Sequence, residues 1–414
     1  MIENELQPKV SVIVPMYNCA QFLPDFFLDM QNQHLRNFEL ICVIDGATDD
    51  TLDVVKRYAT EDNRIRYFCK DNGGAGSARN YGLHYACGEY VMWIDADDRY
   101  SPDLLVEMVS AADKFNANEV LCLFESYDYK TDRMLPIQGF RRKIFPENTC
   151  VDPSEALINN TFAIAGSGPT NKLYRRTFVV NNNLSYSTTR ASNDTKFISA
   201  AISIAKRVVG VHKILIHVKK CINPDSITSN RGKYIQEIPT VYSELYQWLK
   251  ERNLHERYHN TFCRNFKDGI SYNSQFGLNM EFIEAVVYSL NEREPWVNMS
   301  SDEIAKIFNK WFNIEKGKNE LKKLETSIRE NNVEDRGGMI NLLNMEKSRL
   351  ESMALIKMLS NVRYNRNFDD YRIVQLKKKL LNAQNQLKRE KSSWNYRIGS
   401  AITWLPKKIY YLCK

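Results

Sequence analysis

The sequence predicts an α/β fold whose first half is a mostly parallel, Rossmann-like sheet flanked by helices. Short apolar runs that suit buried strands alternate with segments whose apolar residues recur at helical spacing, and this alternation is typical of βαβ units. Polar clusters follow the ends of several of these runs. Because ligands of open α/β sheets bind at the carboxyl ends of strands, we expect a ligand site along one edge of the sheet.

Four apolar runs in the first hundred residues are the expected strands. A segment with helical spacing follows the first run, from Phe22 to Met30, and another follows the second, beginning at a cap formed by Asp49, Asp50 and Thr51. Alternation at these lengths requires a sheet that helices cover on both faces. The four runs are Val10–Pro15, Phe38–Ile44, Ile65–Cys69 and Tyr90–Ile94.

The fourth run ends in the three carboxylates of Asp95, Asp97 and Asp98. Aspartates crowded at a strand end repel one another unless a positive group lies among them, and a divalent cation with oxygen ligands is the usual solution. The alternative is a solvated acidic turn before a helix, because Ser101 and Pro102 suit an N-cap and the first helical position.

A glycine-rich segment, residues 71–82, lies between the third and fourth runs. Its glycines permit tight backbone curvature, and a helix is expected to start near Ser77 with Arg79 in its first turn. A helix N-terminus beside a guanidinium can hold an anion such as a diphosphate. The segment matches neither the Walker pattern nor the dinucleotide fingerprint, so an ordinary glycine-rich loop is the alternative.

Four motifs of this chain occur together in the order and at the spacing of one enzyme family. They are Val12-Ile-Val-Pro-x-Tyr17-Asn18, Asp45-Gly-Ala-Thr-Asp49, Asn72-Gly73-x-x-Gly76-x-Ala-Arg79-Asn80-x-Gly82 and Gly88-Glu-Tyr-Val-x-x-Ile-Asp95-x-Asp97-Asp98. With these motifs the chain resembles the family-two inverting glycosyltransferases. The resemblance is strong over residues 8–125 and continues more weakly to about residue 230.

The resemblance implies a GT-A fold that holds a nucleotide-diphosphate sugar, most often with uridine as the base. It implies that Pro15 and Tyr17 line the base pocket, that Asp45 reads the base edge, and that Asp95 meets the ribose. It also implies that Asp97 binds the Mg²⁺ or Mn²⁺ that bridges the diphosphate. The implied donor-binding residues are Pro15, Tyr17, Asn18, Asp45, Gly73, Arg79, Asp95, Ala96 and Asp97.

The chain departs from the family pattern at two positions. The family usually has two consecutive aspartates where this chain has Ile44 and Asp45, so base recognition would depend on Asp45 alone. The family's catalytic base follows another acid, where this chain has Asn193, which leaves Asp194 as the implied base. A base must take the proton of the acceptor hydroxyl while its oxygen attacks the anomeric carbon. Judged on residue type alone, Asn193 and Asp194 also suit a helix N-cap.

Further along, Lys172, Arg175 and Arg176 form a basic cluster that could approach the diphosphate or an acceptor phosphate. The alternative for such a cluster is a solvated face. Residues 223–228 lie where related enzymes have a mobile loop that closes over the donor.

The composition places limits on the class of protein. A hydrophobic content of 43% in 414 residues is enough for two or three domains with a sizeable core. The nine cysteines include no Cys-x-x-Cys pair, which favours reduced core thiols over a zinc site or a disulfide framework. No apolar run has the length of a membrane span, and the first residues lack the features of a secretory signal, so we expect a cytoplasmic protein.

The second half of the sequence changes character, because strand patterns give way to helical ones from about Lys233. We expect a GT-A domain at residues 1–232, with a nucleotide-sugar half at 8–125 and an acceptor half at 126–232. An all-α domain at 233–336 and a helical, basic tail at 337–414 would follow. The tryptophans and tyrosines of the helical region are expected in its core rather than in a carbohydrate platform.

The basic residues of the tail account for the net charge. Residues 371–414 hold eleven Lys and Arg and one Glu, a balance of +10, so the total of +7 leaves −3 for residues 1–370. Apolar residues from Trp394 to Leu405 share a helical face beside basic and aromatic residues, which suits a helix lying on an anionic membrane surface. A nucleic-acid-binding tail and docking to a partner protein are the alternatives. The apolar spacing of residues 373–387 also suits a short coiled coil.

The sequence therefore predicts a cytoplasmic enzyme at the inner face of the cell membrane that does not bind nucleic acid. It would move a sugar from a nucleotide-diphosphate sugar, with uridine favoured, to a hydroxyl of a glycan or lipid-linked acceptor, with inversion, in capsule or other surface polysaccharide synthesis. The alternative is a non-catalytic nucleotide- or glycan-binding subunit of a polysaccharide assembly complex, which the changes at Ile44 and Asn193 motivate. The sequence indicates no oligomeric state.

Overall fold

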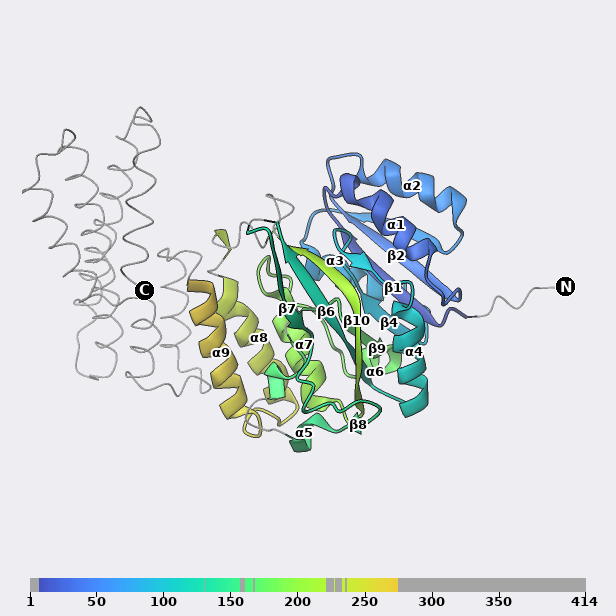
Figure 1. The fold of residues 1–414 in the computed structure, drawn as a ribbon. Helices are drawn as coiled ribbons and strands as arrows, with labels where there is room; N and C mark the ends of the chain where they lie inside the picture. Colours follow the sequence, from blue (N-terminus) through green and yellow to red (C-terminus); the bar gives the residue numbers. More distant parts are fainter. Residues whose placement is uncertain are drawn as a thin grey trace, which may run out of the picture. The chain divides into compact units, whose positions relative to one another are not determined.

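The computed structural model describes residues 7–129, 131–156, 161–166, 168–220, 227, 233–234 and 237–274 (Figure 1). Contacts divide the chain into a first compact unit, Met1–Phe266, and a second, Lys267–Lys414. The predictions for the loop at 223–228, for most of the helical domain and for the basic tail lie outside the described residues.

The described residues form a mixed sheet in the order β3-β2-β1-β4-β9-β6-β10-β5, in which β7 also pairs with β6 and β8 with β10. β1 pairs in parallel with β2 and β4, β2 with β3, and β6 with β10, whereas β9 is antiparallel to both β4 and β6. The strands are β1 (Val10–Met16), β2 (Phe38–Asp45), β3 (Ile65–Lys70), β4 (Tyr90–Trp93), β5 (Arg99–Tyr100), β6 (Glu119–Asp128), β7 (Arg133–Gln138), β8 (Cys150–Val151), β9 (Lys172–Arg175) and β10 (Val208–Lys220).

The four predicted strands of the first hundred residues are confirmed to within one residue at each end. All residues of β2 and β4, and all but Pro15 of β1, are fully or almost fully buried. This is expected for strands of a sheet that is covered on both faces. The predicted α/β fold is therefore confirmed. The sheet is parallel from β1 to β4, whereas the described sheet as a whole is mixed.

Helices lie on both faces of the sheet (Figure 1). Apolar residues of α1 and α4 share one buried cluster with Val10, Val12 and Val14 of β1. On the other face, α3 packs against β1 and β2, and α7 packs against α3 and α8. The helices are α1 (Leu23–Gln31), α2 (Thr51–Glu61), α3 (Ala75–Leu83), α4 (Leu104–Phe115), α5 (Pro153–Ala156), α6 (Arg176–Asn181), α7 (Asn193–Ile204), α8 (Ile238–Glu251) and α9 (His259–Ser274), with the 3₁₀ turns η1 (Ala20–Phe22) and η2 (Thr161–Ala163).

Helix α8 belongs to the first unit and stands beside α7 in Figure 1. Its apolar stripe of Tyr242, Leu245, Tyr246 and Leu249 is buried, as the helical spacing predicts. Tyr242 and Tyr246 make ring contacts with Phe262 of α9. These aromatic residues are therefore core residues.

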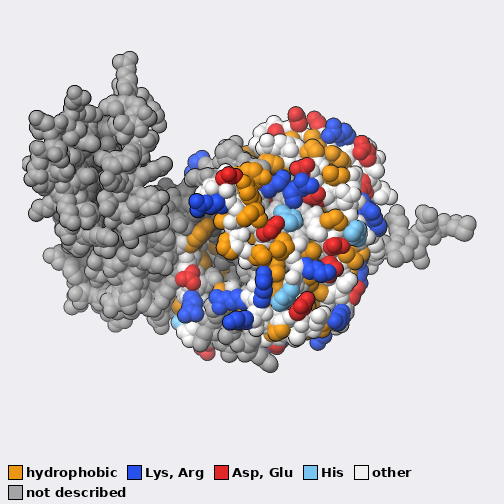
Figure 2. Space-filling view, viewed as in Figure 1, with side chains coloured by type: hydrophobic (Ala, Val, Ile, Leu, Met, Phe, Trp, Pro, Cys, Tyr) orange, Lys and Arg blue, Asp and Glu red, His pale blue; other side chains and the backbone are white. Residues whose placement is uncertain are grey.

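The part of the chain that the structure describes contains no helix that is both long and apolar enough to cross a bilayer. On the face of the molecule shown in Figure 2, basic and acidic side chains are interspersed. This mixture agrees with the small net charge of the sequence outside the tail.

Candidate active site

The loops that follow β1 and β2 meet at the carboxyl edge of the sheet. Asn18 follows β1 in the left-handed region, at φ 47°, and its Oδ1 accepts a hydrogen bond of 2.8 Å from the backbone N–H of Thr48. Tyr17, next to it, is 52% exposed, so its ring is open to contact with a ligand. Pro15 lies near the end of β1, where this edge begins.

Asp45, the last residue of β2, holds the start of α3. Its Oδ1 accepts hydrogen bonds from Lys70 Nζ at 2.7 Å and from the N–H of Gly73 at 2.9 Å. Its Oδ2 accepts one from the N–H of Gly74 at 2.7 Å. A carboxylate has about four acceptor positions, so these three bonds leave about one for a ligand. Asp45 therefore shapes the glycine-rich loop, and its implied role in reading a base stays a prediction.

Helix α3 starts at Ala75, two residues before the predicted start. Gly74 precedes it at φ 86°, a conformation that residues with a Cβ rarely adopt. At Gly76 a Cβ would lie 2.0 Å from the backbone oxygen of Ser187, so glycine allows the close approach between α3 and the segment before α7. This approach brings Arg79 to Asn193.

Arg79 is a buried cation that joins two parts of the site. Its Nη2 donates to Asp95 Oδ1 at 2.8 Å, and its Nη1 donates to Asn193 Oδ1 at 3.0 Å. Its guanidinium also lies 5.3 Å from the ring centre of Tyr186. Burial alone would lower the pKa of Arg79, but the charges of Asp95, Tyr186 and Asp194 and the hydrogen bond to Asp95 together outweigh it, so the pKa is raised. The guanidinium therefore stays charged between the turn after β4 and the start of α7.

The turn after β4 brings Asp95, Asp97 and Asp98 together. The side chain of Asp95 is 35% exposed. Burial and the charge of Asp95 raise the pKa of Asp97 to about 6, and the ammonium of Lys219 opposes this shift more weakly. Asp98 is buried, and its Oδ1 accepts a hydrogen bond of 3.0 Å from the N–H of Lys219 in β10. Asp98 therefore ties the turn to β10, while Asp95 and Asp97 remain partly accessible.

The described residues contain no group of three or more His, Cys, Asp or Glu that could hold a metal ion. The oxygens of Asp97 nevertheless fit a divalent cation, because its carboxylate is held among like charges with little compensation. Mg²⁺ in particular is usually bound by one or two carboxylates together with substrate phosphates and water. Ala96, between Asp95 and Asp97, is buried.

Asp194 is the second residue of α7, and its charge acts on the same buried cation. Ser192 occupies the N-cap position, and Asn193 and Asp194 are the first two helical residues. The charge of Asp194 contributes to the raised pKa of Arg79, after the larger contributions of Asp95 and Tyr186. The charges of the predicted base, Asp194, and of the predicted ribose-binding residue, Asp95, thus both act on Arg79.

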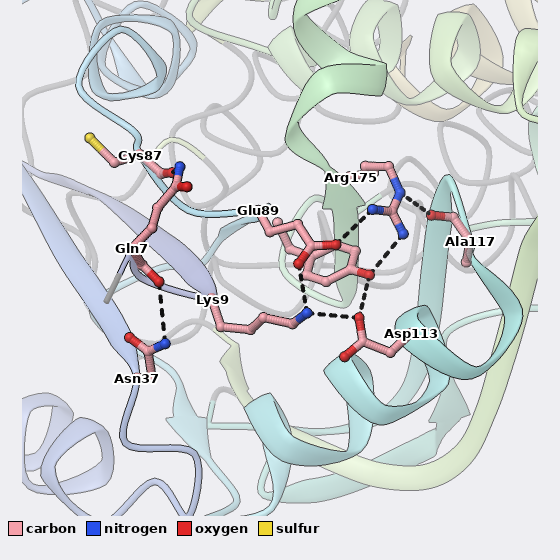
Figure 3. A network of polar contacts seen from close by, with 9 residues as sticks. Gln7, Lys9, Asn37, Cys87, Glu89, Asp113, Ala117 and Arg175 are labelled. Atoms are coloured by element: carbon pink, nitrogen blue, oxygen red, sulfur yellow. Dashed lines mark hydrogen bonds and ion pairs between the residues drawn. The ribbon is translucent and has the colours of Figure 1, made fainter. Parts of the chain in front are cut away.

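The predicted basic cluster of Lys172, Arg175 and Arg176 does not exist as a unit. Arg175 bonds to Glu89 Oε1 at 2.7 Å and to the phenol oxygen of Tyr90 at 2.9 Å (Figure 3). Arg176 donates to the backbone oxygen of Gly88. Because Gly88 and Glu89 precede β4 and Asp95 follows it, these two arginines lie at the opposite edge of the sheet from the site.

Lys172 lies apart from the two arginines and is completely buried. The charges of Glu119 and Asp194 act on its ammonium. Glu119 was not predicted from the sequence, and Lys172 was expected on the surface or near a phosphate. The signal was present, since each is a charged residue at the start of a strand and directly precedes apolar residues.

The described residues have the GT-A fold. The structure resembles that of Staphylococcus aureus TarS residues 1–349 in complex with UDP, with a TM-score of 0.55 and 19% identity over 87% of this chain and 94% of that chain. The complex of the same protein with UDP-GlcNAc gives a TM-score of 0.56 at the same identity and coverage. At this identity the likeness concerns the fold, and the predicted GT-A fold is confirmed.

Residues 11–179 match the model of glycosyl transferase family 2, so this part of the chain is a domain of that family. The chain is 35% identical over 144 residues to the uncharacterized glycosyltransferase RT0329 of Rickettsia typhi, covering 34% of this chain and 44% of that one. It is 28% identical over 256 residues to the putative glycosyltransferase EpsH of Bacillus subtilis, covering 61% and 72%. The chain thus matches less than half the length of the first relative. The predicted likeness to family two is therefore confirmed for residues 11–179.

Proposed function

We propose that this protein transfers a sugar from a nucleotide-diphosphate sugar, with uridine as the favoured base, to the hydroxyl of a glycan or lipid-linked acceptor, with inversion. The observation that carries the proposal is the pair of hydrogen bonds from Arg79 to Asp95 and to Asn193. These bonds join the carboxyl edge of the sheet, where the donor nucleotide would lie, to the start of α7. The structures of TarS with UDP and UDP-GlcNAc support the class of donor.

The donor would lie across the carboxyl edge of the first strands. The exposed ring of Tyr17 would contact the base, and Asp95 would accept hydrogen bonds from the ribose hydroxyls. The loop that Asp45 holds would present the start of α3 to the donor, since helix N-termini favour anions. Arg79 would hold Asp95 in place through its hydrogen bond.

Asp97 would hold a Mg²⁺ or Mn²⁺ ion together with oxygens of the diphosphate. The cation supplies charge neutralisation to the nucleoside diphosphate as it leaves. For its part, the chain keeps Asp97 half-buried beside Asp95, where a positive charge is favoured.

Asp194 would take the proton of the acceptor hydroxyl. The acceptor oxygen forms a bond to the anomeric carbon while the bond from that carbon to the phosphate oxygen breaks, and the electron pair leaves with the nucleoside diphosphate. One displacement of this kind inverts the configuration at the anomeric carbon. A positioned carboxylate base contributes about 10²–10⁴-fold to such a rate.

The experiment is a screen of nucleotide-diphosphate sugars in which release of nucleoside diphosphate is measured with and without acceptor. We expect Asp194→Asn to lower kcat/KM by about 10²–10⁴-fold. Asp53→Asn is the matched control, because Asp53 is a highly exposed aspartate on α2. The mechanism is refuted if Asp194→Asn is as active as the parent chain. If the parent binds nucleotide but transfers no sugar to any acceptor, the alternative hypothesis of a non-catalytic binding subunit is correct.

We also propose that the product is a cell-surface polysaccharide and that the tail places the enzyme at the inner face of the membrane. The excess positive charge of residues 371–414 supports contact with anionic lipid. Flotation with vesicles containing phosphatidylglycerol, comparing the full chain with one ending at Ser392, tests the placement. Equal flotation of the two would refute it.

A further inference from the structure

Two opposite charges are completely buried behind the start of α7. Glu119 begins β6 and Lys172 begins β9, and both side chains are fully shielded from solvent. The antiparallel register pairs Glu119 with Tyr174 and Leu121 with Lys172. The two charged residues are therefore diagonal neighbours on one face of the sheet, within reach of long side chains.

This sheet face is the one that α7 covers. Tyr174 makes ring contacts with Trp93 of β4 and Phe197 of α7, at centroid distances of 6.0 and 5.2 Å. Phe197 is three residues after Asp194 and stacks on Tyr186 at 4.4 Å. The aromatic cluster thus fixes the first turn of α7 over the buried pair.

Lys172 is held by two hydrogen bonds. Its Nζ donates to the backbone oxygen of Gly168 at 2.5 Å and to Asn171 Oδ1 at 2.8 Å. At Gly168 an added Cβ would meet nothing within 4 Å, so the outer side of this backbone faces open space. The ammonium therefore supports the inner side of a loop whose outer side is accessible.

The buried charge of Glu119, unlike that of Lys172, has little compensation from hydrogen bonds. Neither oxygen of Glu119 has a hydrogen bond of normal geometry within the described part of the chain, although the Tyr174 hydroxyl lies close enough to lower its pKa. Burial raises the pKa of Glu119 to about 7. Burial likewise lowers the pKa of Lys172 to about 8, against the charges of Glu119 and Asp194. The negative charges of Glu119 and Asp194 thus both act on the ammonium of Lys172.

Among the described residues, two other cations near the start of α7, Arg79 and Lys196, already have hydrogen-bond or ion-pair partners. Arg79 divides its two Nη groups between Asp95 and Asn193. Lys196 of α7 pairs with Glu244 of α8 at 3.3 Å. Other titratable groups around this turn are the buried Tyr186, Tyr174 and Cys122. Arg190, just before the turn, donates from its Nη1 to Asn72 Oδ1.

We propose that Lys172 is a positioning residue for sugar transfer, whose buried ammonium keeps Asp194 ionised as the base and also holds the backbone of Gly168 through a hydrogen bond. The inference rests on the proposed function, in which Asp194 is the base. A positive charge near a carboxylate favours its ionised form, and the negative charge of Glu119 near the same ammonium moderates this effect.

The test measures the titration of Asp194 directly. Protein labelled with ¹³C at the aspartate carboxyl carbons is titrated by NMR, and Asp194→Asn identifies the signal. We expect Lys172→Met to raise the pKa of Asp194 by on the order of one unit, because a nearby positive charge is lost. Glu119→Gln should shift it in the opposite direction, and Lys172→Arg should retain most of the parent value.

A second comparison covers the case in which Lys172→Met does not fold. The double variant Lys172→Met, Glu119→Gln removes both charges, so neither is left buried alone. Its Asp194 should titrate at higher pH than that of Glu119→Gln alone. The inference is overturned if Asp194 titrates identically in these two variants, because Lys172 would then be a structural residue only.

The pH dependence of activity separates this inference from the proposed function. With Lys172→Met, or with the double variant against Glu119→Gln, the acid limb of kcat/KM should move to higher pH by the shift that NMR measures. If the parent chain transfers no sugar from any donor, the proposed function fails while the NMR comparison still decides the role of Lys172. If the parent is active and the limb does not move, the role of Lys172 fails while the function stands.

Discussion

Arg79→Lys tests whether one guanidinium couples the donor and acceptor sides of the site. Arg79 donates to Asp95 at 2.8 Å and to Asn193 at 3.0 Å from its two Nη groups. A lysine ammonium is a point charge and retains at most one of these bonds in this geometry. A hydrogen bond that involves a charged group contributes about 1.5–3 kcal/mol. Because the side chain of Asp95 is 35% exposed and water can replace part of the loss, we expect the low end, about 1.5–2 kcal/mol.

That loss corresponds to a fall in kcat/KM of about 10–30-fold. The assay is release of nucleoside diphosphate over a range of donor and acceptor concentrations, with circular dichroism to establish folding. Arg175→Lys is the matched control, because Arg175 also uses both Nη groups, on Glu89 and Tyr90, at the opposite edge of the sheet (Figure 3). If Arg79→Lys and Arg175→Lys have the same activity as the parent, Arg79 does not couple the two sides of the site.

Three further outcomes follow from named contacts. Asp97→Asn should abolish most of the gain in donor affinity that Mg²⁺ or Mn²⁺ provides in calorimetry, whereas Asp53→Asn should leave it unchanged; an equal gain in both would refute the metal role. Gly76→Ala should lower the free energy of unfolding by about 1–3 kcal/mol in urea titrations, because its Cβ would lie 2.0 Å from Ser187 O, and Gly168→Ala should be nearly neutral because nothing lies within 4 Å. The pKa of Glu119 is raised by burial to about 7 from 4.5, so its contribution to stability is complete below pH 4.5 and is lost as the pH rises through 7. Glu119→Gln should therefore flatten the fall in unfolding free energy between pH 5 and 7.5, and an unchanged slope would contradict the burial of this carboxyl as the cause.

Much of the fold was predictable because it depends on local pattern. Apolar runs such as Tyr90–Trp93 are buried on both faces and end where the polar clusters begin, so the strands could be located from periodicity. The carboxyl edge followed from the alternation of strands and helices, and it carries Asp45, Asp95 and Asp97 as expected. The antiparallel direction of β9 was not predictable, because it depends on a connection between distant elements.

The less predictable part of the site depends on partners far apart in the chain. Asp45 was expected to meet a base, yet three of its acceptor positions are taken by Lys70, Gly73 and Gly74. Lys172 looked like part of a basic cluster with its neighbours in sequence, but side chains alternate along a strand. That alternation turns Lys172 into the interior beside Glu119, while Arg175 reaches Glu89 at the edge.

The sequence by itself determined the class of fold, the family, and the acidic turn that ends β4, because these depend on periodicity and on motifs within one element or one loop. Only the tertiary structure decided that Arg79 joins Asp95 to Asn193 and that Lys172 is buried where the charges of Glu119 and Asp194 both act on its ammonium. Arg79 and Asn193 are 114 positions apart. No pattern within one segment predicts such a pair, because the packing of α3 against α7 on one face of the sheet brings the two residues together.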